Sequence, residues 1–307
     1  IHHLTRHRYQ SAVSYSPHQL YLRPLDSHLR QVDQFTVETI PASTQRWVRD
    51  AYGNAVLACN FELQESEVLE FRTRIEVTIH EDNPFDFILD SYATGYPFAY
   101  REPDIKALLP FMGSSGRTQG ALKVIDWLSG AAATPKTHLD VVQFLSDLNS
   151  AIRREIAYVR RDEEGIQTPD ATLDLKTGSC RDMAVLFISA VRKLGFAARF
   201  VSGYLFDPPV GAGGDHCFNR AVGSMHAWAE VYLPGAGWIG LDVTSGLFAG
   251  EGHIPLACTP DPISAAPVTG AIERAEVTFH FENTVTRIYE DPRVTKPYTD
   301  EQWGKVE

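Results

Sequence analysis

The sequence lacks any apolar run long enough to cross a bilayer. The longest uninterrupted apolar stretch near its middle is Ala184–Ile188, whereas a membrane-spanning helix needs about 20 apolar residues. The first residues, Ile1–Arg8, contain no apolar core of the kind that a secretory signal requires. We therefore expect a soluble, unexported, cytoplasmic protein that does not act at a membrane.

Basic charge is also scarce. The chain carries 28 Lys and Arg against 39 Asp and Glu, which gives a formal net charge of −11. No basic run is longer than the pairs Arg153–Arg154 and Arg160–Arg161. Because a phosphate backbone would repel such a chain, we exclude nucleic acid as its main partner.

Cysteines are few and unpaired. The four of them, Cys59, Cys180, Cys217 and Cys258, include no Cys-x-x-Cys pair. In a chain of 307 residues this excludes a disulfide framework and a zinc knuckle. No Asp-rich loop of EF-hand type is present either. We therefore expect free thiols in a reducing compartment, with no metal and no other cofactor.

The length suits two domains, each with its own core. In the first, Phe71–His80 alternates apolar and polar residues as a strand does, and the turn Asp50–Asn54 before Ala55–Cys59 predicts a hairpin. Several short strands with regular turns predict an N-terminal β-sandwich domain over residues 1–112. The segment Gly113–Gly116 marks the boundary.

Residues 113–307 combine helices with later strands, which predicts an α+β domain. The segment Thr137–Asp140 resembles a capping box, and apolar residues follow it at helical spacing. A second, almost wholly apolar helix follows Cys180. Strands are expected over Ala197–Leu205, Met225–Leu233, Trp238–Val243 and Ala275–Phe281, the last of them closing the domain at its C-terminal end.

Cys180 opens this second helix. Ser179 can cap the helix, with Asp182 completing a Ser-x-x-Asp box. The thiol then lies in the first turn, where free backbone N–H groups and the helix dipole stabilise a thiolate. A lone cysteine in such a place is more often a small buried apolar residue. The residues downstream favour the reactive interpretation.

Two later segments predict a hairpin around the turn Pro234–Gly237. If Tyr232 lies opposite Trp238, then Asp242 lies diagonal to His226 on the same face of the sheet, within reach of a hydrogen bond. A slip of one residue would send the carboxylate to the opposite face. We predict the first register, although a satisfied strand histidine and a turn-capping aspartate are the alternative interpretations.

This geometry predicts a catalytic triad of Cys180, His226 and Asp242. His226 accepts the thiol proton and returns it to the leaving amine, and Asp242 fixes the imidazole tautomer. The backbone N–H of Cys180 serves as one oxyanion donor. For the second donor we consider Trp127, Gln143 and Asn149.

Four segments carry a resemblance to a known family. Residues 177–184, 194–204, 226–235 and 237–242 are similar to the core of bacterial transglutaminase-like proteins, and residues 1 to about 100 resemble the β-rich N-terminal region often fused to it. The resemblance implies a papain-like thiol fold, in which a central helix bearing the Cys packs on an antiparallel sheet. It implies Cys, His and Asp in that order, at Cys180, His226 and Asp242. One departure is Asp242-Val243-Thr244, where the family commonly has Asp-Pro-Thr.

The resemblance implies acyl transfer on peptide or amide substrates through a thioester. We favour hydrolysis, as in a cysteine peptidase or amidase, over amine transfer of transglutaminase type. The alternative from another class is a non-catalytic interaction module with a vestigial triad. A rival site, Asp215-His216-Cys217, offers the same groups in succession, but adjacent loop residues seldom converge on one point. The sequence leaves the oligomeric state open.

Overall fold

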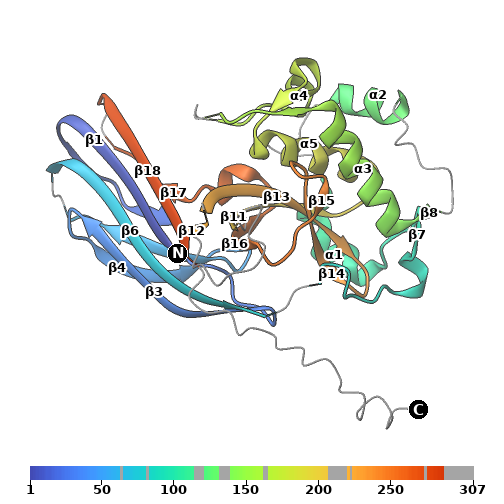
Figure 1. Ribbon diagram of the computed structural model, residues 1–307, viewed down its shortest axis with the longest axis horizontal. Coiled ribbons are helices and arrows are strands. Elements are labelled where there is room, and N and C mark those ends of the chain that lie inside the picture. The colour runs from blue at the N-terminus through green and yellow to red at the C-terminus, as the bar shows by residue number, and fades with distance from the viewer. Residues whose placement is uncertain are drawn as a thin grey trace, which may run out of the picture.

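The computed structural model describes residues 1–62, 65–80, 83–113, 121–130, 139–161, 165–206, 220–221, 223–272 and 275–286. In these ranges a strand-rich half and a mixed helical half lie side by side (Figure 1). No helix of the described ranges is long and apolar enough to span a membrane.

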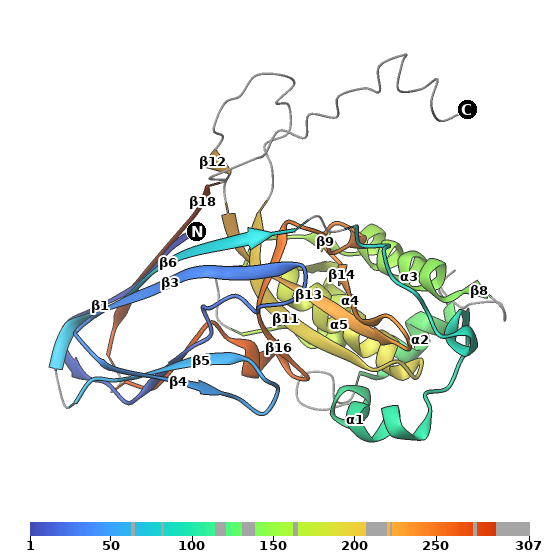
Figure 2. The same ribbon diagram turned by 90° about the horizontal axis from the view of Figure 1, so that it is seen from below.

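Two antiparallel sheets build the strand-rich half, and Figure 2 shows them as two layers, with β3 and β6 above β4 and β5. The strand orders are β12-β18-β1-β6-β3 and β17-β2-β5-β4. Buried residues of both sheets, among them Leu57 and Phe71, share one apolar core, as the predicted sandwich requires. The strands are β1 (His2–Ser14), β2 (His18–Leu20), β3 (Arg30–Ile40), β4 (Thr44–Arg49), β5 (Ala55–Asn60), β6 (Glu65–Ile79), β12 (Arg220–Ala221), β17 (Val268–Thr269) and β18 (Val277–Thr286).

The last strand belongs to the strand-rich half. β18 pairs antiparallel with β1, with His2 opposite Thr284 and Tyr9 opposite Val277, and lies beside it in Figure 1. β17 likewise pairs with β2. The strand predicted near the C-terminal end of residues 113–307 is therefore present, but it pairs with β1 and not with the sheet of the helical half. Strand pairing between distant segments has no local signal in the sequence.

Residues 95–112 pack with the helical half, before the predicted boundary at 112/113. β7 (Gly95–Tyr96) pairs with β8 (Leu139–Asp140), and the Tyr96 ring stacks on Phe144 at 4.3 Å and on Phe196 at 5.2 Å. A helix not predicted, α1 (Glu102–Met112), follows β7 with a proline in its first turn. Of the expected boundary segment, only Gly113 lies within the described residues.

A five-stranded antiparallel sheet packed against α5 (Cys180–Lys193) forms the helical half. All α5 side chains from Asp182 to Arg192 are buried, and they share a core with the inner face of the sheet. The predicted central helix on an antiparallel sheet is thus confirmed. The sheet order is β15 (Leu247–Phe248), β14 (Gly237–Asp242), β13 (Gly223–Leu233), β11 (Ala198–Phe206) and β16 (His253–Thr259).

Shorter elements complete this half. They are α2 (Leu122–Gly130), α3 (Val141–Glu155), α4 (Pro169–Leu175), the parallel pair β9 (Ala157–Tyr158) and β10 (Thr177–Gly178), and the 3-10 turns η1 (Ser91–Ala93) and η3 (Pro262–Ala265). The apolar face expected for α3 is buried. Its cap is Asp140, whose side chain accepts from the N–H groups of Val142 and Gln143. Within the predicted capping box over Thr137–Asp140, Asp140 is therefore the N-cap residue. Thr137 and His138 lie outside the described residues.

Candidate active site

Cys180 is the first residue of α5 and is partly exposed. The predicted capping box is present: the buried carboxylate of Asp182 accepts from the Ser179 N–H and hydroxyl, both at 2.8 Å. Burial raises the pKa of Asp182, but the hydrogen bonds from Ser179 and Gln167 outweigh burial and lower it. The cap therefore stays charged and fixes the start of the helix, so the thiol has a set position.

The hairpin adopts the predicted register. Tyr232 lies opposite Trp238 and Ala229 opposite Leu241, which places Asp242 diagonal to His226 on one face. His226 Nε2 lies 3.2 Å from Asp242 Oδ2, and both residues are buried. Two sequence-predicted site residues, 16 positions apart in the chain, are thus brought into contact by the pairing of β13 with β14.

Cys180 also acts on His226, as one of the groups that raise the pKa of its ring. Because Nε2 faces Asp242, Nδ1 is the nitrogen left for the thiol. Burial by itself lowers the pKa of His226, but the hydrogen bonds and negative charges of Asp242 and Cys180 outweigh it and raise the pKa to about 9. Direct contact with Asp242 and the influence of Cys180 therefore both favour a protonated His226 ring.

Asp242 accepts from more donors than the sequence indicated. Its Oδ1 takes the Thr244 N–H at 2.9 Å and the Thr244 hydroxyl at 2.8 Å. Burial raises its pKa, but the hydrogen bonds from His226 and His253 lower it well below the ordinary range. The turn after Asp242 lacks the proline common in the family, and the two Thr244 donors orient the carboxylate instead.

His253 is a site residue that sequence reasoning missed. Its Nε2 lies 3.3 Å from Asp242 Oδ2, while its Nδ1 accepts the Gly250 N–H at 3.2 Å. A neutral ring that accepts at Nδ1 carries its proton at Nε2, so His253 donates to Asp242. Sequence reasoning missed His253 because this residue reaches the site through the pairing of β16 with β11, which has no local signal in the sequence.

The cluster of His226, Asp242 and His253 has the residue types of a metal site, with ligand atoms within 4.8 Å of one another. However, a ring nitrogen that carries a proton has no lone pair for a cation. His253 Nε2 is in this state because Nδ1 accepts from Gly250. The donor set fits a hydrogen-bonded carboxylate better than a metal ion.

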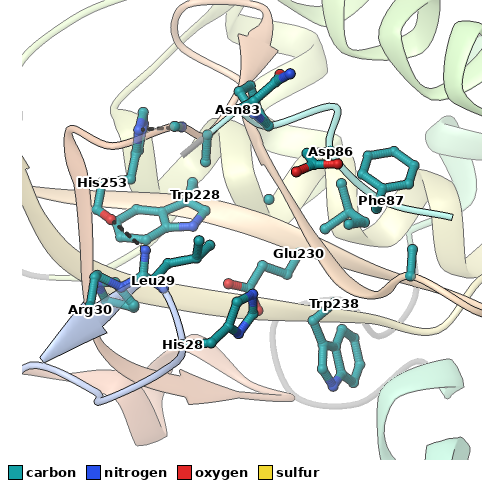
Figure 3. A pocket seen from close by; sticks show the side chains of 17 residues that line it. His28, Leu29, Arg30, Asn83, Asp86, Phe87, Trp228, Glu230, Trp238 and His253 are labelled. Atoms are coloured by element: carbon teal, nitrogen blue, oxygen red, sulfur yellow. Dashed lines mark hydrogen bonds between the residues drawn. The ribbon is translucent and has the colours of Figure 1, made fainter. Parts of the chain in front are cut away.

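A pocket of about 170 Å³ is lined in part by His253 of this cluster (Figure 3). His253 and Trp228 form one wall, and Glu230 and Trp238 continue it along the sheet. His28 and neighbouring residues of the strand-rich half close it, whereas Cys180 does not line it. The pocket is thus a neighbour of His253 and not the place where the thiol would meet a substrate.

Each of the three side chains considered as the second oxyanion donor makes a local hydrogen bond. Trp127 Nε1 donates to Glu155 and Gln143 Nε2 donates to Asp147. Asn149 Nδ2 donates to the carbonyls of Asp242 and Leu247, at 3.3 and 3.1 Å. The geometry therefore does not favour any of the three as the second donor.

The remaining thiols do not compete with Cys180 among the described residues. Cys59 and Cys258 are buried, and burial raises the pKa of both. A thiol in that state is a poor nucleophile. The rival segment Asp215-His216-Cys217 lies outside the described residues.

Three family models match the chain. Residues 128–243 match the transglutaminase-like superfamily, and residues 1–78 match the bacterial transglutaminase-like N-terminal region. Residues 273–307 match a third model, described as "Putative amidoligase enzyme". The first model ends one residue after Asp242 and so includes the Cys180, His226 and Asp242 positions.

Similar proteins cover nearly the whole chain. Uncharacterized proteins of Mycobacterium tuberculosis and Mycobacterium bovis are each 31% identical over 292 residues, which cover 88% of this chain and 86% of theirs. A solved structure described as a "Putative Cysteine Protease" from Cytophaga hutchinsonii is 17% identical, covers 94% of this chain and 90% of its own, and superposes with a TM-score of 0.69. The likeness to the solved structure shows that the two chains share a fold, which in this chain is the predicted papain-like packing of the Cys180 helix on an antiparallel sheet.

Proposed function

Because this chain belongs to the transglutaminase-like superfamily and carries its bacterial N-terminal region, we propose that it is a thiol enzyme that cleaves peptide or amide bonds. Cys180 is the nucleophile, His226 the general acid and base, and Asp242 the group that orients and charges the imidazole. The observation that supports the proposal is the buried contact of His226 Nε2 with Asp242 Oδ2 at 3.2 Å, with Cys180 near enough to help raise the pKa of the same ring.

The chemical steps follow from the positions of these groups. The Cys180 thiolate attacks the carbonyl carbon, a C–S bond forms, and the carbonyl electron pair moves to oxygen. When the C=O bond re-forms, the C–N bond breaks and the amine leaves with the proton held on His226. Water, deprotonated by His226, then attacks the thioester and releases the acid and the thiol.

Water is our first choice of acceptor because Cys180 is partly open to solvent, so bulk water reaches a thioester formed there. Amine transfer of transglutaminase type is the second candidate, since family membership includes it. The two are separated by mass analysis of the products with and without an added primary amine. The free acid alone in the presence of amine supports hydrolysis, and an amide product supports transfer.

The first experiment measures the thiol itself. Iodoacetamide should alkylate Cys180 rapidly at about pH 6, where an ordinary thiol is almost fully protonated. In His226→Ala the rate at that pH should fall at least about tenfold, because the imidazolium partner is lost. His28→Ala, which removes an exposed histidine, is the matched control.

Activity is then sought with a library of peptides and amides, with Cys180→Ala run beside the native protein. Turnover that disappears in Cys180→Ala supports the enzyme. Slow, uniform alkylation of the thiols, together with no Cys180-dependent turnover, would instead favour an interaction module with a vestigial triad.

A further inference from the structure

Tyr158 lies on a short strand tied directly to the residues that precede the nucleophile. β9 pairs in parallel with β10, with Tyr158 beside Gly178, two residues before Cys180. The Ala157 N–H donates to Lys176 O at 2.8 Å, and the Val159 N–H donates to Gly178 O at 2.9 Å. The backbone on both sides of Tyr158 is therefore held against the segment that leads into α5.

Side chains fix the same strand to the helix cap. Arg161 Nη1 lies 2.6 Å from the buried carboxylate of Asp182, which caps α5. Arg181 Nη2 donates back to the carbonyl of Arg161 at 3.0 Å. Since Arg181 follows Cys180 and Asp182 anchors the first turn, Tyr158 and the thiol are carried by one hydrogen-bonded unit, which is the preorganisation that an oxyanion site needs.

The Tyr158 side chain is 47% exposed, and within the described residues its hydroxyl makes no hydrogen bond. Burial raises the pKa of Tyr158, and the negative charges of Cys180 and Asp242 raise it further. Two consequences follow. The hydroxyl lies within electrostatic reach of two triad members, and it keeps its proton at neutral pH, so it can donate.

We propose that the Tyr158 hydroxyl is the second oxyanion donor, acting with the backbone N–H of Cys180 on the same oxygen. This inference rests on the proposed function. As the Cys180 sulfur bonds to the carbonyl carbon, the displaced electron pair on oxygen accepts from both donors. When the C=O bond re-forms and the leaving group departs, the hydroxyl returns to solvent with its proton.

The test compares two small reagents that attack the same sulfur. p-Nitrophenyl acetate acylates Cys180 through a tetrahedral oxyanion and releases p-nitrophenolate. Iodoacetamide alkylates the same thiolate by displacement of iodide, without an oxyanion. In Tyr158→Phe the acylation rate should fall about 10²- to 10³-fold, in line with the loss of one oxyanion donor, while the alkylation rate stays within about twofold.

Tyr52→Phe is the matched control: it removes the same hydroxyl from a tyrosine that is 42% exposed, on the turn between β4 and β5. Its two rates should equal those of the native protein. Equal acylation by Tyr158→Phe and native protein would overturn the inference. A parallel fall of both rates would also overturn it, because the hydroxyl would then act on the thiolate.

The same measurements separate this inference from the proposed function. A native Cys180 that reacts with both reagents no faster than an ordinary thiol overturns the proposed function, and the inference falls with it. A native Cys180 with an activated rate, unaffected by Tyr158→Phe in both reactions, leaves the nucleophile intact and rejects Tyr158 alone.

Discussion

At the scale of single residues, the position of Asp242 determines the state of the site. One oxygen accepts from two histidine rings, and the other accepts both donors of Thr244. A buried carboxylate with this many donors remains charged. Its charge in turn is a large part of what holds His226 protonated.

Replacing this carboxylate tests that dependence. In Asp242→Asn the pKa of His226 should drop from about 9 toward its ordinary value of about 6.5, since the amide supplies no negative charge. The Cys180-dependent rate should fall on the order of 10³-fold, because the tautomer and the charged ring are no longer favoured. An NMR titration of histidine ring signals measures the pKa directly.

The ring signal of the exposed His28 serves as an internal reference in the same spectra. The sign of the change matters for activity as well. An imidazolium that persists to about pH 9 can protonate the leaving amine up to that pH, so the variant's activity should decline at lower pH than the native protein's. A His226 signal that titrates identically in both proteins would contradict this account.

How far the residues could be predicted depends on how local their signals are. Cys180 and Ser179 carried a capping pattern, and His226 and Asp242 followed from strand alternation across a short turn. His253 reaches Asp242 only because β16 pairs with β11, and no spacing in the sequence encodes that pairing. Asn149 has an amide that could donate to an oxyanion, but this amide donates to the carbonyls of Asp242 and Leu247.

At the scale of elements, the start of α5 depends on one buried carboxylate. Asp182 accepts from the Ser179 N–H and hydroxyl, the Gln167 N–H and the Arg161 guanidinium. Asp182→Ala would leave these donors without an acceptor. We expect the free energy of unfolding to fall by about 3 kcal/mol, the typical cost of breaking a buried pair, as measured by urea denaturation.

Asp126→Ala, an exposed acid on α2, should change stability by less than about 0.5 kcal/mol. The pH dependence gives a second check. Because the pKa of Asp182 is lowered on folding, its stabilisation is present above about pH 3.8 and is lost as pH falls through the lowered value. Native protein and Asp182→Ala should therefore differ most near neutrality, and a constant difference down to strongly acidic pH would contradict the assignment.

Gly203 on β11 shows how closely two elements approach behind the site. A Cβ at this position would lie 2.3 Å from the Ile254 carbonyl oxygen and 2.5 Å from the Trp228 ring. Gly203→Ala should therefore displace β16 and Trp228 and with them His253. We expect a loss of about 1–3 kcal/mol of stability from overpacking, together with a lower Cys180-dependent rate.

The matched substitution is Gly130→Ala at the end of α2, where a Cβ meets nothing within 4 Å. Urea denaturation and the acylation rate are measured for both variants. If Gly203→Ala behaves like Gly130→Ala, the close packing of β11, β16 and Trp228 is not what supports His253.

At the scale of the whole molecule, the two halves share core residues, which the predicted division into two domains with separate cores did not include. The core of the strand-rich half includes Tyr204, Ile254 and Leu256, which come from β11 and β16 of the five-stranded sheet in the helical half. The Tyr204 hydroxyl lies 3.1 Å from His3 Nδ1 on β1. The sequence predicted two separate cores because composition and periodicity indicate which side chains of a strand are buried. They do not indicate which sheet those side chains pack against.

This shared core leads to a prediction about cooperativity. We expect one unfolding transition, with the two halves losing structure together, since neither half can lose Tyr204 or Leu256 without exposing the other's core. Leu20→Ala in the strand-rich half and Leu145→Ala in α3, both at fully buried positions, should each lower stability by about 2–5 kcal/mol. Amide hydrogen exchange, followed by mass spectrometry at rising urea concentration, reports β5 and α5 in one experiment. Each substitution should move the midpoints of both elements equally, whereas a shift confined to the half that carries the substitution would show that the halves unfold independently.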